Sequence, residues 1–412
     1  MNKAIKTFLV FFILYGTMFL FGYIENTKGV TYPLIKAQFD ISYEQQGAMV
    51  SLLSLSYVLF CFVGGILIGS FGVKKSFAAG YVFMILGLVG AFLLPGFLSV
   101  AAALFVVSAS FGLFEVSLNA LGTQVFTARA ALLMSLLHFF YGAGSSISPR
   151  IAGVIASALG WRNIYLLSIP LVLLFFIPSF FTTFPKPAGE EQAGERQTEE
   201  QKAADGKAKK PGFFTALKTP MVWVFAIALG LMVAVEMSSA NWAGLYFQDV
   251  YHLDPKTSGA AFISNFFILF TLSRLLSGFA IEKIGYMRSL FIAVTATFVI
   301  YILGFILGEK GINVLPGLGL FVAILWPTTI AIAMGYFRED APVMTSAIIV
   351  IAGALNAGIQ YLIGLADRVD PAWGYRSCII YSVFTIIAVI VLSRRMRRPY
   401  RKSIAQGMSR PA

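Results

Sequence analysis

Charged residues are scarce in this chain. Only 12% of its 412 residues are Asp, Glu, Lys or Arg, whereas a soluble domain carries about a quarter. Too few polar side chains remain to cover the surface of a soluble fold. With 58% hydrophobic residues and a mean hydropathy of +0.81, the chain needs a lipid bilayer as the solvent for most of its length.

The residue patterns of enzymes and metal sites are also missing. The chain has two cysteines, Cys61 and Cys378, and both lie inside apolar runs, without disulfide or metal-ligand spacing. No Gly-Lys-Ser/Thr phosphate loop occurs, which argues against an ATP-driven pump. No His-Glu-x-x-His arrangement or paired nucleophile occurs either. We therefore expect no enzyme activity, no cofactor and no metal site.

The net charge of +12 does not indicate nucleic-acid binding, because the excess basic residues sit beside apolar spans. The largest group is Arg394, Arg395, Arg397, Arg398, Arg401 and Lys402. Retention of basic residues on the cytoplasmic side explains them better. The expected partners are a small-molecule substrate, protons and the lipid bilayer, and we expect a monomer.

Twelve apolar spans follow one another in two sets of six. The first set lies near residues 7–34, 43–69, 77–95, 99–126, 131–157 and 161–182. The second lies near residues 219–248, 257–281, 288–307, 314–336, 342–366 and 373–393. The sequence thus predicts an all-α membrane protein with twelve transmembrane helices in two pseudo-symmetric six-helix bundles. The first span lacks a cleavage site, so we expect a retained helix rather than a signal peptide.

A polar segment separates the two sets of spans. Residues 186–210 are rich in Glu, Lys, Gln, Ala and Gly and cannot bury enough apolar surface to order a core. We expect an N-terminal bundle at 1–185, a cytoplasmic linker at 186–217, a C-terminal bundle at 218–396 and a basic cytoplasmic tail at 397–412.

Two short motifs recur at nearly the same offset. The loop after the second span and the loop after the eighth span carry glycines 213 residues apart, namely Gly65 with Gly278 and Gly72 with Gly285. The sixth and twelfth spans open with Gly160-Trp161-Arg162 and Gly374-Tyr375-Arg376, which are 214 residues apart. Two motifs at one offset across six spans indicate a duplicated half.

In this architecture and in these loops, the chain resembles the major facilitator superfamily of secondary transporters. The superfamily's loop after the second helix is roughly Gly-x-Leu-x-Asp-Arg-x-Gly-Arg-Arg. The first copy here keeps the glycines and a terminal basic pair, Lys74 and Lys75, but has Gly69 and Ser70 in place of Asp-Arg. The resemblance implies two bundles that rock around a central site.

Four residues near these loops are expected to act in gating. Glu282 lies in the second copy of the loop, which is closer to the superfamily pattern, and Lys74 and Lys75 lie in the first. Arg274 stands near the cytoplasmic end of the eighth span, eight residues before Glu282. We expect Arg274 to tie the cytoplasmic gate.

Ionisable residues inside the spans are functional candidates, because a charge at membrane depth is costly unless it is paired or hydrated. They are Glu25, Lys28, Glu115, His138, Arg150, Glu236 and Arg274. In the superfamily, the first, fourth, seventh and tenth helices line the central cavity. All three glutamates fall on that set.

Glu115 and Asn119 are four residues apart and should share one face of the fourth helix. Their pattern, Gly-x-x-Glu-x-x-x-Asn from Gly112, is similar to the fourth helix of the fucose permease group of sugar:proton symporters. That resemblance implies a proton-coupling role for Glu115 and contact with sugar hydroxyls for Asn119. The alternative is a glutamate that only fixes helix packing.

Glu236, Asn241 and Trp242 resemble the seventh-helix stretch of related glucose permeases and are further cavity candidates. Glu25 and Lys28 are three residues apart, so they can neutralise each other as readily as they contact substrate. The aspartate that fucose permease has slightly further along helix one is Gly29 here, which leaves the proton-carrying carboxylate open.

Several other residues supply hydrogen-bonding groups or stacking planes. Trp326, Asn356 and Gln360 are expected to contribute to a substrate site. His138, Tyr141 and Arg150 on the fifth span are weaker candidates, since a lone buried histidine is more often a packing residue. The sequence around Arg150 resembles a distorted form of an element common in drug antiporters, so export of drugs remains an alternative function.

The combined pattern predicts a secondary active transporter that takes up a small polar solute, such as a sugar, together with protons. Two alternatives remain at this point. One is a proton antiporter that exports drugs or other apolar compounds, and the other is a carrier of an organic anion, which Lys28 and Arg150 could meet.

Basic residues also predict the orientation. One side carries the linker, the tail, Lys3, Lys6, Lys74, Lys75, Arg129, Lys283, Arg288 and Arg338; the other carries Lys36, Arg162, Lys256, Lys310, Arg368 and Arg376. The linker and tail decide the balance, so we expect a multi-pass protein of the inner cell membrane with both termini in the cytoplasm.

Topology reporters test this orientation. A reporter fused after Arg398 and another inserted near Gly206 should both report a cytoplasmic location, because basic segments are retained on that side. Paired enzymatic reporters, each active on one side of the membrane only, make the measurement. An external signal from either position would reverse the orientation.

Overall fold

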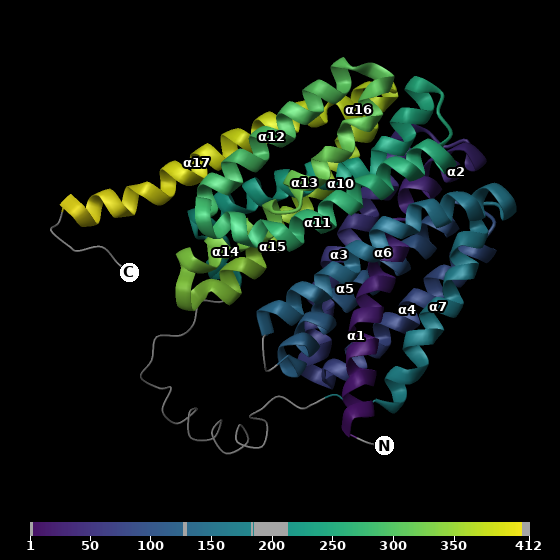
Figure 1. The fold of residues 1–412 in the computed structure, drawn as a ribbon, viewed down its shortest axis with the longest axis horizontal. Helices are drawn as coiled ribbons and strands as arrows, with labels where there is room; N and C mark the ends of the chain where they lie inside the picture. Colours follow the sequence, from purple (N-terminus) through teal and green to yellow (C-terminus); the bar gives the residue numbers. More distant parts are fainter. Residues whose placement is uncertain (1–2, 127–129, 183, 185–212, 406–412) are drawn as a thin grey trace. The chain divides into compact units, whose positions relative to one another are not determined.

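The computed structural model describes residues 3–126, 130–182, 184 and 213–405, and the ordered elements of this part of the chain are all helical (Figure 1). Eleven helical segments within it are long and apolar enough to cross a membrane. A further helix, α6, is 30 residues long and stands where the fifth span was predicted. The predicted all-α membrane fold is confirmed.

The described residues of the first half form seven helices. They are α1 (Lys3–Glu25), α2 (Lys28–Phe39), α3 (Tyr43–Phe71), α4 (Val73–Leu93), α5 (Phe97–Val125), α6 (Ala130–Leu159) and α7 (Arg162–Phe181). These bounds agree with the predicted spans to within a few residues. The exception is the first span, which is divided between α1 and α2.

The second half contains more and shorter elements. They are α9 (Phe213–Leu217), α10 (Pro220–Tyr251), η2 (Pro255–Gly259), α11 (Ala260–Ile284), α12 (Tyr286–Ile306), η3 (Gly308–Asn313), η4 (Leu315–Gly317), α13 (Leu318–Val322), α14 (Leu325–Phe337), η5 (Arg338–Asp340), α15 (Ala341–Val369), α16 (Trp373–Arg376) and α17 (Cys378–Ala405). The predicted tenth span, 314–336, is divided among η4, α13 and α14. Glycine and proline recur in this stretch, and both weaken a continuous helix.

The chain forms two compact units. Unit 1 comprises residues 1–31 and 55–211, and unit 2 comprises residues 32–54 and 212–412. Helix α3 contributes its first turns to unit 2 and the remainder to unit 1. Most of the predicted linker lies outside the described residues, and the predicted limits of the two bundles stay a prediction.

Glycines allow the helices of unit 1 to approach closely. A Cβ atom on Gly22 of α1 would overlap the carbonyl oxygen of Tyr141, and one on Gly144 of α6 would overlap that of Phe19. The two glycines therefore form a reciprocal crossing between α1 and α6. Inside a membrane such small-residue crossings hold helices together through close backbone packing.

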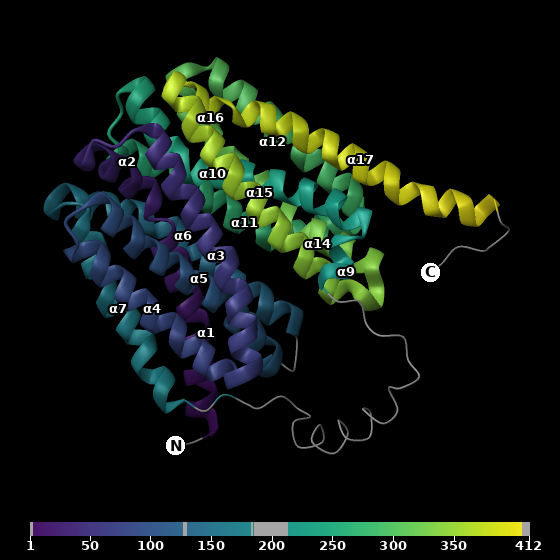
Figure 2. The same ribbon diagram turned by 180° about the vertical axis from the view of Figure 1, so that it is seen from behind.

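Unit 2 uses the same device between α10 and α15. A Cβ atom on Gly230 would lie 2.9 Å from the carbonyl oxygen of Ala352. Helices α10, α15 and α17 lie side by side in this unit (Figure 2). The small residue brings together the helices that carry Asn241 and Gln360.

One position of the duplicated glycine motif requires glycine because of its backbone conformation. Gly72 and Gly285, 213 residues apart, have φ angles of 84° and 90° and precede α4 and α12. Residues other than glycine rarely adopt this conformation, so both loops need glycine for the same turn.

The glycines that open the sixth and twelfth spans, Gly160 and Gly374, differ in backbone conformation. Gly160 has a φ of 87°, whereas Gly374 is absent from the positive-φ residues of the described chain. Gly374 instead lies against Asp367, whose carboxylate accepts a 2.7 Å hydrogen bond from the Gly374 N–H. A side chain at position 374 would collide with that carboxylate.

The crossing at Gly144 yields a stability prediction. Gly144→Ala should lower the free energy of unfolding by roughly 1–3 kcal/mol, because its methyl group meets backbone rather than a movable side chain. The matched control is Gly65→Ala, since nothing lies within 4 Å of a Cβ at that position. Thermal unfolding in one detergent compares the two. Equal melting temperatures would show that the crossing is looser than the structure indicates.

Candidate functional site

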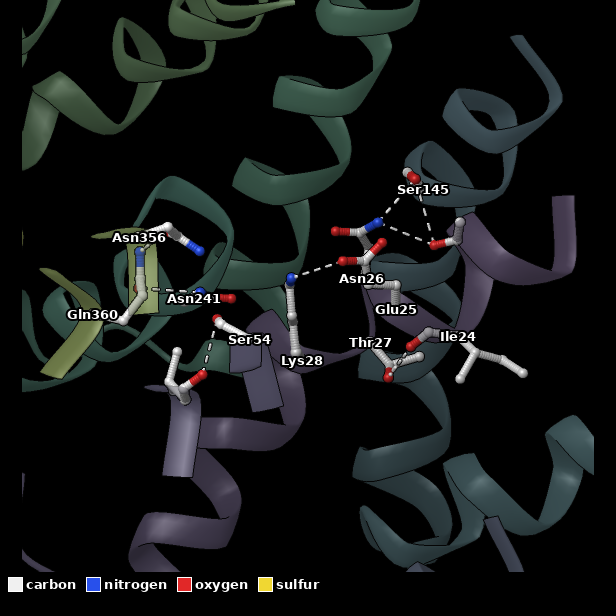
Figure 3. Close-up of polar contacts among 12 residues, drawn as sticks. Ile24, Glu25, Asn26, Thr27, Lys28, Ser54, Ser145, Asn241, Asn356 and Gln360 are labelled. Atoms are coloured by element: carbon white, nitrogen blue, oxygen red, sulfur yellow. Dashed lines mark hydrogen bonds and ion pairs between the residues drawn. The ribbon is translucent and has the colours of Figure 1, made fainter. Parts of the chain in front are cut away.

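A cluster of polar side chains surrounds the break in the first span of unit 1. The Tyr141 hydroxyl on α6 donates to Glu25 Oε2 at 2.7 Å. Lys28 Nζ lies 3.4 Å from Glu25 Oε1 (Figure 3). Next to them, Asn26 Nδ2 donates to Ser145 Oγ at 2.9 Å. The structure thus brings together three predicted residues, Glu25, Lys28 and Tyr141.

At the break, side chains bond to backbone carbonyls that also accept backbone N–H groups. Asn26 Nδ2 donates to the carbonyl oxygen of Gly22 at 3.1 Å, and Thr27 Oγ1 donates to that of Ile24 at 2.8 Å. Such local bonds offer the backbone an alternative to the helix. Asn26 is not among the candidates predicted from the sequence. An amide between two charged residues in an otherwise apolar span is the signal that could have found it.

The break also explains why Glu25 and Lys28 are paired. Glu25 is the last residue of α1 and Lys28 is the first of α2, so each meets a helix-dipole end of its own sign. Their side chains are only 19% and 11% exposed. Each charge therefore depends on the other for compensation, and the Tyr141 hydroxyl adds a hydrogen bond to the carboxylate.

Glu115 and Asn119 form a second polar pair in unit 1, on α5. Asn119 Nδ2 donates to Glu115 Oε1 at 3.0 Å and to the Glu115 backbone carbonyl at 2.7 Å. Both side chains are half-buried. The two residues share one helix face, as their spacing predicted, and the amide orients the carboxylate. Whether they bind protons or substrate stays a prediction.

Unit 2 contains a network of uncharged side chains centred on Gln360 of α15. Gln360 Oε1 accepts from Asn241 Nδ2 at 3.1 Å, and Gln360 Nε2 donates to Asn356 Oδ1 at 3.1 Å (Figure 3). Gln360 Oε1 also accepts from Trp242 Nε1 at 2.8 Å. All four side chains are buried. Four residues selected from the sequence therefore belong to one hydrogen-bonded group.

One acceptor of this network is left over. Asn241 Oδ1 is buried and has no hydrogen-bond partner among the described residues. A buried amide oxygen without a partner is unfavourable. A donor from a bound solute would satisfy it.

The remaining substrate candidates lie on several helices. Glu236 is buried on α10, five residues before Asn241. Trp326 is half-buried on α14, and His138 is half-buried on α6, one turn before Tyr141. Arg150 is exposed on α6. Roles in transport for these four residues stay predictions.

Two of the gating candidates make contacts within their own units. Lys74 Nζ donates to the carbonyl oxygens of Phe180 and Thr182 at 3.1 and 2.9 Å, so it caps the C-terminus of α7. Lys75 lies 5.9 Å from the ring centre of Phe71. The contacts of Lys74 give it a structural function whether or not it also gates.

The other two gating candidates lie on α11. The Arg274 guanidinium lies over the Phe270 ring at 4.4 Å, and its buried Nε has no hydrogen-bond partner among the described residues. Glu282 is exposed. A buried guanidinium N–H that lacks an acceptor is costly, so Arg274 is suited to find one in another conformational state.

Comparison with known proteins gives a family match over most of the chain. The model of the Major Facilitator Superfamily matches residues 8–361. The chain is 26% identical over 207 residues to the "Probable sulfoacetate transporter SauU" of Cupriavidus necator, covering 48% of this chain and 47% of that protein. It is 21% identical over 252 residues to the "Cis,cis-muconate transport protein" of Acinetobacter baylyi, covering 61% and 60%. The matches span less than two thirds of either relative.

Solved structures show the same fold at low sequence identity. A D-xylose–proton symporter matches with a TM-score of 0.74 and 14% identity, covering 93% of this chain and 97% of that one. The transporter FucP in its outward conformation matches with a TM-score of 0.62 and 15% identity, covering 94% and 99%. The nucleoside transporter NupG matches with a TM-score of 0.74 and 10% identity, covering 94% and 99%.

The contacts of Arg274 suggest a test of gating. Arg274→Ala should slow transport by roughly fivefold or more while substrate affinity stays nearly unchanged, because the residue biases a conformational equilibrium. Counterflow rates and binding affinities in proteoliposomes measure the two effects separately. Arg274→Lys, which keeps the charge, should be slowed less. A parallel loss of affinity would place Arg274 in the substrate site instead.

Proposed function

The chain belongs to the major facilitator superfamily, and we propose that it is a proton-coupled carrier of a small uncharged polar solute, such as a sugar, working by alternating access. The observation that carries this proposal is the Gln360 network. Its amide and indole groups are buried and uncharged, and one acceptor is left over. Groups of this kind bind hydroxyls by hydrogen bonds that fix orientation without requiring charge.

Proton coupling requires a group whose charge changes during the cycle. Glu115 is half-buried and hydrogen-bonded by Asn119, so its carboxylate is oriented but not fully enclosed. Protonation would remove a charge that is costly to carry through a dry interior. A proton gradient can in this way drive movement of a neutral solute.

A small organic anion is the second candidate substrate, and Lys28 is the observation that favours it. Its side chain is only 11% exposed, and it is the first residue of α2, where backbone N–H groups also attract anions. The two curated relatives described above carry anions by name. An anion would have to compete with Glu25 for Lys28, which becomes easier when Glu25 is protonated.

A binding screen separates the two substrates. Purified protein is heated with hexoses, with short carboxylates and sulfonates, and with lipophilic cations, because a ligand of the folded state raises the melting temperature. Stabilisation by hexoses supports the proposal. Stabilisation by anions alone, if it is lost in Lys28→Gln, would favour the organic anion as the substrate. Stabilisation by the cations alone would refute both.

The coupling role of Glu115 is tested by removing its charge. Glu115→Gln keeps the size and hydrogen-bonding capacity but imitates a permanently protonated carrier. It should exchange substrate at close to the parental rate but no longer accumulate it under an imposed pH gradient. Asn119→Ala should instead weaken affinity by roughly five- to tenfold, the value of one hydrogen bond, and keep the pH dependence.

Transport into proteoliposomes with and without a pH gradient makes both measurements. Glu309→Gln serves as the matched control, because it removes an exposed carboxylate outside the spans' polar clusters. Accumulation at the parental level in Glu115→Gln would exclude this residue from coupling. The same assay on Glu236→Gln and Glu25→Gln would then identify the coupling carboxylate.

A further inference from the structure

An apolar groove of about 490 Å³ lies on unit 2 between three helices. It is lined by Val224, Ile227 and Leu231 of α10, Leu355 of α15, and Phe384, Ile387, Ala388 and Val391 of α17. Several of these side chains are half exposed, including Ile227 at 46% and Phe384 at 52%. The groove is therefore open along its length, and its volume is in the range of small-molecule sites, about 300–1,000 Å³.

The groove ends beside basic residues. Residues 224–231 of α10 and 384–391 of α17 line the same groove. Tyr375, just before α17, donates to Ser239 Oγ, further along α10, at 3.3 Å. The start of α17 therefore lies near the later part of α10, and the two helices are antiparallel. The lining positions of α17 follow the spacing of one helix face. That face continues to Arg394 and Arg395, three and four residues beyond Val391, which is about 5 Å along the axis. Both are exposed.

The facing end of α10 has the character of a membrane interface. Trp223 lies one turn before Ile227 on the groove side, is 45% exposed and donates its indole N–H to the Leu217 carbonyl at 2.8 Å. Lys218, just before α10, is exposed. Tryptophan and basic residues together mark the level of lipid headgroups. The apolar groove thus runs from the hydrocarbon region to a positively charged rim.

We propose that this groove binds one anionic phospholipid, with an acyl chain along the eight apolar side chains and the phosphate near Arg394 and Arg395. The apolar lining fits a hydrocarbon chain, and the charge of the rim selects the headgroup. None of the eight lining residues belongs to the polar clusters described above, so the proposed lipid site is distinct from those clusters.

Two arginines near a membrane surface should give roughly a 30-fold preference for an anionic over a zwitterionic headgroup at low salt. This preference should fall as the salt concentration rises, because salt screens the charges. Native mass spectrometry with phosphatidylglycerol and phosphatidylcholine of identical chains measures it. The parental protein should retain phosphatidylglycerol preferentially. Arg394→Gln/Arg395→Gln should bind the two lipids equally.

Two further variants make the test specific. Lys256→Gln/Lys310→Gln removes two basic residues, in η2 and η3, that do not lie at the groove. This variant should keep the parental preference for phosphatidylglycerol. Ala388→Phe places a ring in the groove and should lose binding of both lipids, while its melting temperature in plain detergent shows that it is folded. Parental lipid binding in Ala388→Phe, or an unchanged preference in the double arginine variant, would overturn the proposal. So would a parental dimer that Ala388→Phe converts to a monomer, since a second copy would then occupy the groove.

Discussion

Every backbone polar group at membrane depth must find its hydrogen bond within the chain, and the rest of this structure depends on that constraint. It makes the ordered elements of the described chain helical and limits where a helix can stop. At the break between α1 and α2, the Asn26 amide and the Thr27 hydroxyl add hydrogen bonds to backbone carbonyls that also accept backbone N–H groups. The same break puts Glu25 and Lys28 at opposing helix ends, where each needs the other.

Close helix crossings bring polar side chains into contact within each unit. Gly22 and Gly144 bring α1 against α6, so that Tyr141 reaches Glu25. Gly230 brings α10 against α15, so that Asn241 and Trp242 reach Gln360. Without a hydrophobic driving force between helices in lipid, such backbone proximity and the hydrogen bonds it allows are what hold these pairs.

The polar clusters described in the two units differ in chemistry. Those of unit 1 contain the titratable residues Glu25, Lys28 and Glu115, whereas the Gln360 network of unit 2 joins uncharged amides and an indole. Unit 2 also holds the buried carboxylates of Glu236 and Asp367. A carrier that couples protons to a neutral solute needs both kinds of group, one to change charge and one to recognise hydroxyls. This difference is the main physical support for the proposed function.

The sequence by itself determined the membrane class, the spans, the glycine loops and the spacing of Glu115 with Asn119, because these follow from hydropathy, backbone conformation and helical periodicity within one segment. It also selected the four members of the Gln360 network singly. Only the tertiary structure decided that they form one group, since Asn241 and Gln360 are 119 positions apart. The same holds for Lys74, a gate candidate by motif that caps α7, and for Gly374, whose need for glycine comes from Asp367 rather than from its own φ angle. Contacts between distant segments depend on how helices cross, and no local pattern encodes that.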